Sequence, residues 1–207
     1  MILSLDEMRQ ALLPFGVSPD AALGEKIRLY VELLLRWNQK INLTAITTPA
    51  EILERHFGEC FFGAQFLDLS ARQIVDIGSG AGFPGLAIKM ILPGACMTLI
   101  EANKRKAAFL KEVAKSLEMH NVEVVALPLS DLNLRERHFD HVLCRAVGTI
   151  MRVLGWSEKS LRTGGSILLW SSMKDVERIC QDPRWGWEGP FKIPRSNTRV
   201  LLRGRLT

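Results

Sequence analysis

Apolar residues follow a helical rhythm through the first 70 residues of the chain. The first helix is predicted to begin with Ser18 as its N-cap and Pro19 at its first position. One apolar face of this helix is formed by Ile27, Val31, Leu34 and Leu35. A second helix is predicted to restart after Pro49, with one face formed by Ile52, Leu53, His56 and Phe57.

From residue 73 onward, the apolar residues come instead in short continuous runs. The runs with the length and character of strands are 73–77, 96–101, 122–127, 139–147 and 165–170. Helical patterns separate them at 84–92, 103–119 and 150–162. Strands that alternate with helices predict a parallel sheet, and runs without polar alternation predict that both of its faces are covered.

The C-terminal residues show a different pattern. Residues 189–206 predict two strands joined by a short Ser-Asn turn, hence an antiparallel pair at the sheet edge. Together with the earlier runs, this predicts an α/β fold with a doubly wound, mostly parallel, seven-stranded, Rossmann-like sheet. We divide the chain into an N-terminal helical segment, 1–70, packed on a main domain, 71–207.

Composition indicates a globular protein. Hydrophobic residues make up 47% of the 207 residues, and no repeat or low-complexity tract interrupts them. The four cysteines lie far apart and form no CxxC pair, so we expect no metal site, no disulfide framework and a cytoplasmic location. No apolar run is long enough to cross a bilayer and the N-terminus lacks a basic signal region, so we expect no membrane partner.

A glycine-rich loop follows the first predicted strand, in the stretch IVDIGSGAGFPGLAIKM. Gly80, Gly82 and Gly85 match the GxGxxG spacing of dinucleotide loops, whereas a GxGxG register begins at Gly78. Because the strand ends just before Gly78, this residue is the turn glycine, and Phe83 then stands in place of the third dinucleotide glycine. The register disfavours a pyrophosphate and leaves an NAD-dependent oxidoreductase as a weaker alternative.

Two acidic residues narrow the choice of cofactor. Asp76 stands just before the loop, where a carboxylate would repel a pyrophosphate but attract an ammonium or sulfonium group. Glu101 ends the next strand, where a carboxylate can bind ribose hydroxyls. A nucleoside with a cationic amino-acid tail and no phosphate fits both, and S-adenosylmethionine has that form. In the alternative interpretation, Asp76 caps a helix and Glu101 is an ordinary exposed acid.

Basic residues are spread over several predicted elements, and the net charge of +5 permits a polyanionic partner. Lys104, Arg105 and Lys106 follow the N-cap candidate Asn103 against the helix dipole, which suggests an anion nearby. Further cations lie beside aromatic side chains, namely Arg36 and Lys40 around Trp37, and Arg55 beside His56. This mixture suits RNA, although a solvated basic face and a core position for Trp37 explain the same residues.

The sequence shows no Ser-His-Asp arrangement, cysteine-nucleophile motif or metal-ligand spacing. A purine ring nitrogen would need no general base, because its own lone pair attacks once it is aligned with a methyl group. We therefore expect Arg145, at the end of the fourth strand, to position the substrate, since a guanidinium stays protonated. The alternative is that Arg145 merely pairs with an acid such as Asp140.

Five stretches together resemble the bacterial glucose-inhibited division protein B family, and they are RWNQKINLTAIT (36–47), ERHF (54–57), IVDIGSGAGFPGLAIKM (74–90), LIEANKRKAAFL (99–110) and CRAV (144–147). The resemblance covers most of the chain. It implies a class I S-adenosylmethionine-dependent methyltransferase that methylates N7 of a guanosine in small-subunit (16S) ribosomal RNA. The implied partner is that RNA or the small ribosomal subunit.

The resemblance also implies roles for particular residues. Gly78 and Phe83 match the family's cofactor loop. Leu129 and Ser130 match the pair that flanks adenine, and Arg145, the predicted catalytic residue, matches the arginine of an S-R-A motif. The predicted cofactor site consists of Asp76, Gly78, Gly80, Phe83, Glu101, Leu129, Ser130 and Arg145. The predicted RNA contacts are Arg36, Asn38, Lys40, Asn42, Arg55, His56, Arg105 and Lys106.

The chain departs from the family pattern at Glu59, Cys60, Asp175 and Thr198. These departures keep open a non-catalytic or altered-specificity ribosome-assembly factor that retains the cofactor fold. A methyltransferase of small molecules or proteins is a further alternative. The cofactor loop and the spread of basic residues favour the RNA methyltransferase, which we expect to be a monomer.

Overall fold

The computed structural model describes residues 3–68, 70, 73–132, 138–145, 148 and 150–207. Its N-terminal elements are α1 (Leu5–Leu12), a 3-10 turn (Leu13–Phe15) and α2 (Ala21–Asn38). The N-cap of α2 is Asp20 and not Ser18 as predicted, because the Asp20 carboxylate accepts a hydrogen bond from the Leu23 N–H at 2.8 Å. A carboxylate there also interacts favourably with the helix dipole, so the helix begins later than predicted.

A second helical stretch begins at Pro49, as predicted, but its hydrogen-bonding pattern changes along its length. Its parts are α3 (Pro49–Ile52), a π-helical turn (Leu53–Gly58) and α4 (Glu59–Ala64). The spacing of apolar residues did not reveal the wider turn. Such turns are frequent at functional sites, and this one carries Arg55 and His56, two of the predicted RNA contacts.

Seven strands form one sheet in the order β3-β2-β1-β4-β5-β7-β6, which confirms the predicted fold class. The parallel strands are β1 (Gln73–Ile77), β2 (Cys96–Ile100), β3 (Val122–Val125), β4 (Phe139–Arg145) and β5 (Leu161–Ser172). The antiparallel strands at the edge are β6 (Trp185–Lys192) and β7 (Arg199–Leu206), as the C-terminal pattern predicts. The strand order reverses between β1 and β4, which is where open α/β sheets bind ligands.

The remaining helices follow the predicted alternation. They are α5 (Gly85–Ile91), α6 (Lys104–Ser116), α7 (Ile150–Ser160) and a short α8 (Val176–Cys180) after β5. Strand β5 begins where the sequence pattern still predicts helix. Its first residues pair with β4 in a shifted register, and Gly164 has a φ of 79° there, a conformation that glycine adopts at little cost.

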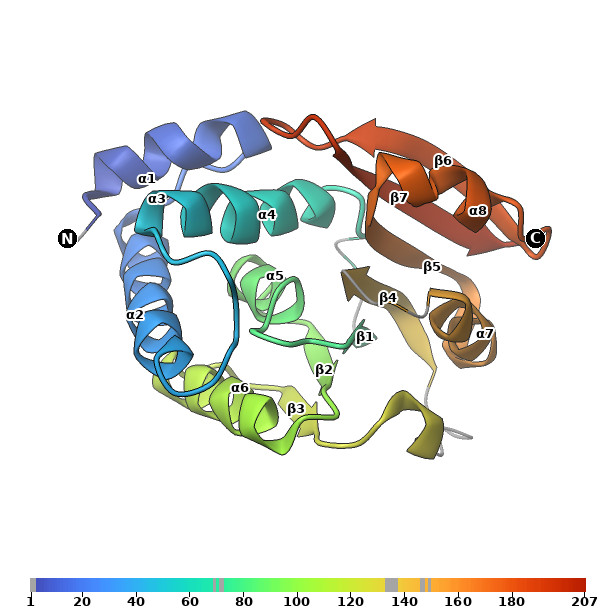
Figure 1. Cartoon of the computed structure of the whole chain (residues 1–207), viewed down its shortest axis with the longest axis horizontal. Helices are drawn as coiled ribbons and strands as arrows, with labels where there is room; N and C mark the ends of the chain where they lie inside the picture. Colours follow the sequence, from blue (N-terminus) through green and yellow to red (C-terminus); the bar gives the residue numbers. More distant parts are fainter. Residues whose placement is uncertain (1–2, 69, 71–72, 133–137, 146–147, 149) are drawn as a thin grey trace.

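Helices cover both faces of the sheet, as the continuous apolar strands predict (Figure 1). Ile74 of β1 packs into the larger core with residues of α1, α2, α4, α5 and α6, whereas Val75 packs into the smaller core with α7 and α8. The N-terminal helices thus share the main core, and a segment boundary near residue 70 stays a prediction. Within the described part of the chain, no helix combines the length and hydropathy of a membrane span.

Candidate active site

The glycine loop after β1 has the backbone that the GxGxG register requires. Gly78, Gly80 and Gly82 have φ angles of 72°, 55° and 86°, a region that favours glycine. Gly85, in contrast, is the first residue of α5 and has no positive φ. The N–H groups of Gly78 and Ser79 both donate to the Ile100 carbonyl, at 2.9 and 3.0 Å, and so fasten the loop to the end of β2. The predicted register, with Gly78 as the turn glycine, agrees with this backbone.

Glu101, just after β2, holds the loop from the other side. Its carboxylate accepts hydrogen bonds from the Gly80 N–H at 2.9 Å and from the Asn103 N–H at 2.8 Å. A carboxylate has further lone pairs, so these bonds leave it able to accept ribose hydroxyls. A Cβ on Gly80 would lie at an ordinary 3.7 Å from the Gly78 carbonyl oxygen, so protein atoms do not fill this side of the loop.

Asp76 has a different place from the predicted one. Its side chain is fully buried, and one carboxylate oxygen accepts a hydrogen bond from the Gly85 N–H at 3.0 Å. Burial raises the pKa of this carboxyl group to about 7. The predicted direct contact with a cationic tail is corrected accordingly, because the carboxylate caps α5 as in the alternative interpretation. A carboxylate at this helix N-terminus occupies the place where a pyrophosphate would bind, which disfavours a dinucleotide.

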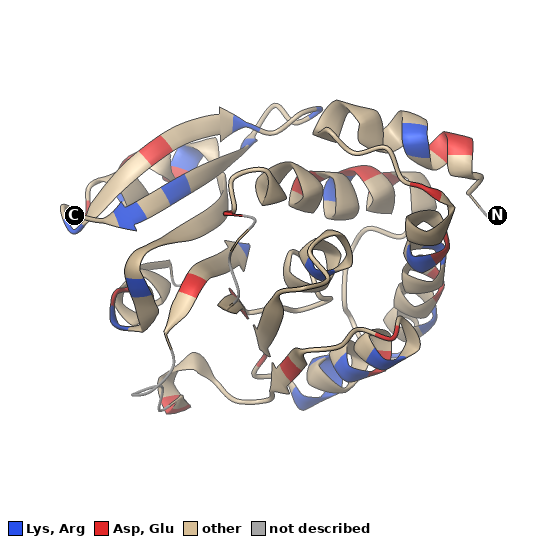
Figure 2. Cartoon of the chain, turned by 180° about the vertical axis from the view of Figure 1, so that it is seen from behind, with Lys and Arg blue, Asp and Glu red and all other residues tan. Residues whose placement is uncertain are grey.

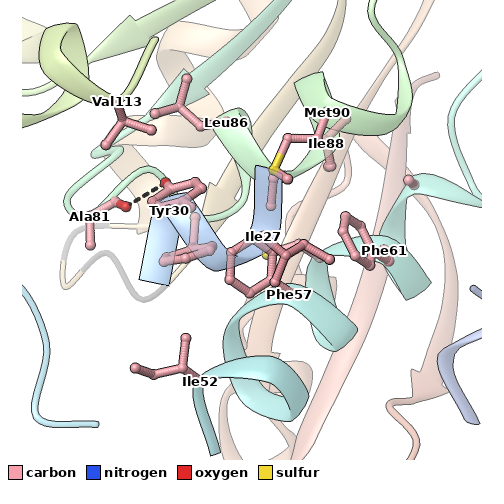
Figure 3. Packing of buried hydrophobic residues seen from close by; sticks show 14 of the residues in the cluster. Ile27, Tyr30, Ile52, Phe57, Phe61, Ala81, Leu86, Ile88, Met90 and Val113 are labelled. Carbon is pink, nitrogen blue, oxygen red and sulfur yellow. Dashed lines mark hydrogen bonds between the residues drawn. The ribbon is translucent and has the colours of Figure 1, made fainter. Parts of the chain in front are cut away.

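Tyr30 and Phe83 connect helix α2 to the glycine loop. The buried Tyr30 hydroxyl donates to the Ala81 carbonyl at 2.7 Å (Figure 3). The Phe83 ring is 7% exposed and lies stacked between Tyr30 and His56, with centroid distances of 5.0 and 4.6 Å. Phe83 therefore belongs to an aromatic cluster of the core, and its backbone is the part that can serve a cofactor.

His56 does not present a cation to solvent. Its ring is buried, and its Nε2 lies 2.9 Å from the Thr44 hydroxyl. Burial, together with the nearby positive charges of Arg145 and Arg55, lowers the pKa of His56 to about 3. The predicted RNA contact is corrected to a packing role, because a neutral buried imidazole supplies no charge for a phosphate.

A cavity of about 680 Å³ opens at the carboxyl ends of β1 and β2, and we call it the cofactor cavity. Its walls include Ile77, Gly78, Ile100, Leu129, Ser130, Val153 and Trp156. Leu129 and Ser130 lie on a 3-10 turn after β3, so the predicted adenine pair does line this cavity. The size falls within the usual range for small-molecule sites. The mostly apolar walls and the open glycine backbone fit a nucleoside, and the cations Arg152 and Lys159 also line the cavity.

A second cavity of about 360 Å³ lies at the carboxyl ends of β4 and β5. We call it the arginine pocket, after its lining residues Arg55, Arg145, Arg178 and Arg199. The Arg145 guanidinium donates to the Arg55 carbonyl at 2.7 Å and lies 3.2 Å from the buried Glu59 carboxylate. The alternative partner Asp140 pairs instead with Arg162 at 3.0 Å. Arg145 thus stands at the predicted strand end, with its ion-pair partner on α4.

The two cavities are neighbours at the reversal of the strand order. Ile77 of β1 lines the cofactor cavity, and its register partner Cys144 of β4 lines the arginine pocket. Adjacent strands lie about 4.8 Å apart. Arg145 follows Cys144 directly and lines the arginine pocket, so the predicted catalytic residue lies on the side of the site away from the cofactor cavity.

The other predicted RNA contacts lie away from these cavities. Lys and Arg residues gather on α6 and on the C-terminal strands (Figure 2). Arg105 is exposed and Lys106 half-buried in the first turn of α6, whose N-cap is Asn103 as predicted. Arg36 is exposed and pairs with Glu112 at 2.8 Å.

The loop after α2 carries both exposed and structural residues. Lys40 and Asn42 are exposed, as an RNA contact requires. The Asn38 amide instead donates to the Thr44 carbonyl at 2.9 Å and accepts from two backbone N–H groups, so it holds the loop in shape. Trp37 packs edge-on against Phe109 with a centroid distance of 5.8 Å, which places it on the core side.

The described residues contain no group of three or more His, Cys, Asp or Glu that could hold a metal ion. Burial raises the pKa of the Cys60 thiol to about 12, so this cysteine is no nucleophile at neutral pH. None of the four cysteines, all of which are described, forms a disulfide.

Sequence reasoning missed several residues of the site. Tyr30, the only tyrosine of the chain, looked like one more apolar position of α2. Glu59 was noted only as a departure from a family pattern, although an acid within the apolar stretch FGECFF is a signal for a buried partner. Arg178 carried no local signal, and Arg199 was only one of several cations near the C-terminus, because the pocket that they line is made by the fold.

Comparison with known proteins agrees with this geometry. The family model described as rRNA small subunit methyltransferase G (GidB) matches residues 24–185. The Ribosomal RNA small subunit methyltransferase G of Stenotrophomonas maltophilia is 32% identical over 191 residues, which is 90% of this chain and 87% of that protein. The protein of the same name from Caldanaerobacter subterraneus subsp. tengcongensis is 31% identical over 182 residues, covering 86% and 76%.

Solved structures of methyltransferases share the fold. The ribosomal protein L11 methylase from Lactobacillus delbrueckii subsp. bulgaricus has a TM-score of 0.63 at 13% identity and covers 74% of this chain and 79% of that one. A SAM-dependent O-methyltransferase from Thermotoga maritima has a TM-score of 0.59 at 14% identity and covers 84% and 71%. These identities support the fold alone, whereas the family model spans most of the sequence. The chain belongs to the rRNA small subunit methyltransferase G family.

Proposed function

We propose that this protein transfers a methyl group from S-adenosylmethionine to N7 of a guanosine in small-subunit (16S) rRNA. The observation that carries the proposal is the adjacency of the cofactor cavity and the arginine pocket at the strand reversal. The first offers glycine backbone and apolar walls to the methyl donor. The second offers guanidinium groups to a polyanionic substrate.

The bound cofactor supplies an electrophilic methyl group. N7 of guanine has its own lone pair, so the protein needs to align the two groups and exclude water. His56 is buried with a pKa of about 3, and the Cys60 thiol has a pKa of about 12, so neither is a base poised near neutral pH. Arg145, held by Glu59 and by the Arg55 carbonyl, fits the task of positioning the substrate.

The proposed cofactor contacts combine the cavity with the glycine loop. Gly78, Leu129 and Ser130 line the cavity, where Leu129 and Ser130 would flank the adenine. Gly80 and Glu101 are bonded to each other in and beside the loop, and would offer backbone and carboxylate lone pairs to the ribose. Phe83 contributes through its backbone, and Asp76 acts indirectly by capping α5. We assign the RNA-facing surface to Arg36, Lys40, Asn42, Arg55, Arg105 and Lys106.

A ribosome-assembly factor without catalysis would have no need for the three positive-φ glycines or for the carboxylate that holds Gly80. Their retention supports the enzyme over this alternative. We assign the enzyme to the cytoplasm, where its RNA is found, and expect it to be monomeric in light scattering.

The test is methyl transfer from labelled cofactor to 16S rRNA that lacks the modification, offered as free RNA and as assembled subunit. We expect label in one nucleotide, and we expect chain scission there after treatment with reductant and aniline, which cleaves at N7-methylguanosine. Label at another atom, or in protein, would contradict the proposal. No transfer with either substrate, despite measurable cofactor binding, would favour the assembly factor.

A further inference from the structure

The arginine pocket concentrates positive charge from four separate elements. Arg55 comes from the π-helical turn, Arg145 from the end of β4, Arg178 from α8 and Arg199 from the start of β7. One carboxylate, Asp175, is among the residues that line the pocket. Guanidinium groups repel one another, so something must hold them together.

Glu59 is the group that holds two of them. It is buried, and its Oε1 accepts a hydrogen bond from Arg199 Nε at 2.6 Å, while its Oε2 lies 3.2 Å from a terminal nitrogen of Arg145. The Trp170 indole N–H fixes the Glu59 carbonyl at 2.8 Å, which ties α4 to β5. One carboxylate thus serves two guanidinium groups, so the pair keeps an excess of positive charge toward the pocket.

The guanidinium groups retain hydrogen-bond donors for a ligand. Each has five N–H donors. Arg199 uses Nε and one terminal nitrogen on Glu59, and Arg178 uses one terminal nitrogen on Asp175 at 3.0 Å. Arg55 pairs with Glu51 through one terminal nitrogen, while its Nε is buried and finds no acceptor among the described residues. The pocket is therefore rich in donors and preorganised before any anion arrives.

We infer that the arginine pocket binds a phosphodiester group of the substrate RNA, next to the nucleotide that receives the methyl group. The inference rests on the proposed function, because the neighbouring cofactor cavity defines where that nucleotide lies. Guanidinium forks match phosphate oxygens in pairs, and the preorganised pocket would lose little entropy on binding.

The guanine base itself is the weaker candidate for this pocket. Arginine also recognises guanine, through O6 and N7. An arginine bound to N7 would block the lone pair that attacks the methyl group. The pocket therefore holds the backbone beside the acceptor and leaves the base free to turn toward the cofactor cavity.

The test compares Arg178→Gln with the matched control Arg162→Gln. Both arginines are exposed by about half, at 59% and 48%, and each pairs with one aspartate at 3.0 Å. Arg162 lies at the opposite end of β5 from the pocket. RNA affinity is measured over a salt series with a 16S fragment that contains the acceptor, and cofactor affinity is measured by calorimetry.

We expect Arg178→Gln to reduce the slope of log affinity against log salt by about 0.7 to 0.9, the value of one phosphate contact. Arg162→Gln should leave the slope unchanged, and both variants should bind the cofactor as the wild type does. Equal slopes for the two variants would overturn the inference.

A second arm identifies the phosphate. RNA fragments carry one neutral methylphosphonate linkage on either side of the acceptor. One of these linkages should weaken binding to the wild type and to Arg162→Gln, and should weaken it less in Arg178→Gln, which has already lost one of the four guanidinium groups. Additive effects in all three proteins would contradict phosphate binding here. Methylation of the unmodified fragment by the wild type reports separately on the proposed function.

Discussion

The cofactor cavity and the arginine pocket lie side by side at the carboxyl ends of the parallel strands, yet they are built in different ways. The cofactor cavity opens beside the glycine loop, whose shape depends on the positive φ angles of Gly78, Gly80 and Gly82 and on the Glu101 carboxylate, and its other walls come from the turn after β3 and from α7. The arginine pocket uses side chains from four elements gathered around the buried Glu59. The glycine loop of the cofactor cavity is a local backbone structure, whereas the arginine pocket is made entirely by the fold.

This difference predicts which substitutions disrupt each site. A backbone loop loses its shape when one residue cannot adopt the required φ. A pocket of charged side chains depends on the geometry of its ion pairs, and a change of one guanidinium alters position while the fold remains. Substitutions should therefore separate cofactor binding from substrate positioning.

The largest effect is expected for Gly80→Val in the loop. Gly80 has a φ of 55°, and a β-branched side chain resists that conformation and points into the open side of the loop. Cofactor affinity in calorimetry should fall by about 100-fold or more, since strain and steric overlap together exceed about 2.7 kcal/mol. RNA affinity should change little.

Gly94→Val is the control for that substitution. Gly94 lies in an exposed turn, has no positive φ, and has no neighbouring atom within 4 Å of the place that a Cβ would take. The variant should bind the cofactor normally. A folded Gly80→Val protein with normal cofactor affinity would remove Gly80 from the site.

Arg145→Lys should have the next largest effect, on substrate positioning in the arginine pocket. Lysine keeps the charge but cannot reach Glu59 and the Arg55 carbonyl together as the guanidinium does. Single-turnover methylation should slow by about 10- to 100-fold, the usual result of lost alignment, while the cofactor Kd stays within about twofold.

The pH dependence of the same single-turnover rates tests whether a catalytic base is involved. From pH 6 to 9 the wild-type rate should show no limb from His56, whose pKa of about 3 lies far below that range. A near-wild-type rate for Arg145→Lys, or a bell-shaped wild-type profile that disappears in His56→Ala, would contradict the positioning role.

Tyr30→Phe should have a smaller effect on the cofactor side. It removes the hydroxyl that donates to the Ala81 carbonyl at 2.7 Å and leaves a buried acceptor unsatisfied. The free energy of unfolding should drop by about 1 to 3 kcal/mol, and KM for the cofactor should rise more than kcat falls. Ser166→Ala removes a buried hydroxyl in the middle of β5 that lies 2.9 Å from His141 Nδ1, and it should lower stability without changing that KM. Equal KM changes in both variants would mean that Tyr30 acts through stability alone.

Asp76→Asn should have the smallest effect on function. Asparagine can still accept from the Gly85 N–H, so cofactor affinity should barely change. A large loss of cofactor affinity would instead support the original prediction that Asp76 contacts the cationic tail directly.

The same substitution should change the pH dependence of stability. In the wild type, burial raises the pKa of Asp76 from 3.8 to about 7, so its contribution to stability is full below pH 3.8 and is lost as the pH rises to about 7. Asparagine does not ionise, so the stability of the variant does not fall in this way as the pH rises. In urea unfolding, the free energy of unfolding of Asp76→Asn should rise relative to that of the wild type between pH 4 and 7, by up to about 1.4 kcal/mol per pH unit. A difference that is independent of pH would contradict the raised pKa.

The sequence by itself determined the order of helices and strands, the edge hairpin and the register of the glycine loop. These features depend on neighbouring residues, through apolar spacing and through the φ angles that glycine alone adopts readily. A family motif marks Leu129 and Ser130 as an adenine pair, and both line the cofactor cavity, while their contact with adenine stays a prediction.

The tertiary structure decided what the polar side chains do. Asp76 caps α5, Asn38 holds a loop, and His56 is buried against Phe83. Nothing in the local pattern separates a buried carboxylate or imidazole from an exposed one, because burial depends on elements that are distant in sequence. Glu59 gathers arginines from β4 and β7 for the same reason, since the electrostatic attraction acts between residues that only folding brings together.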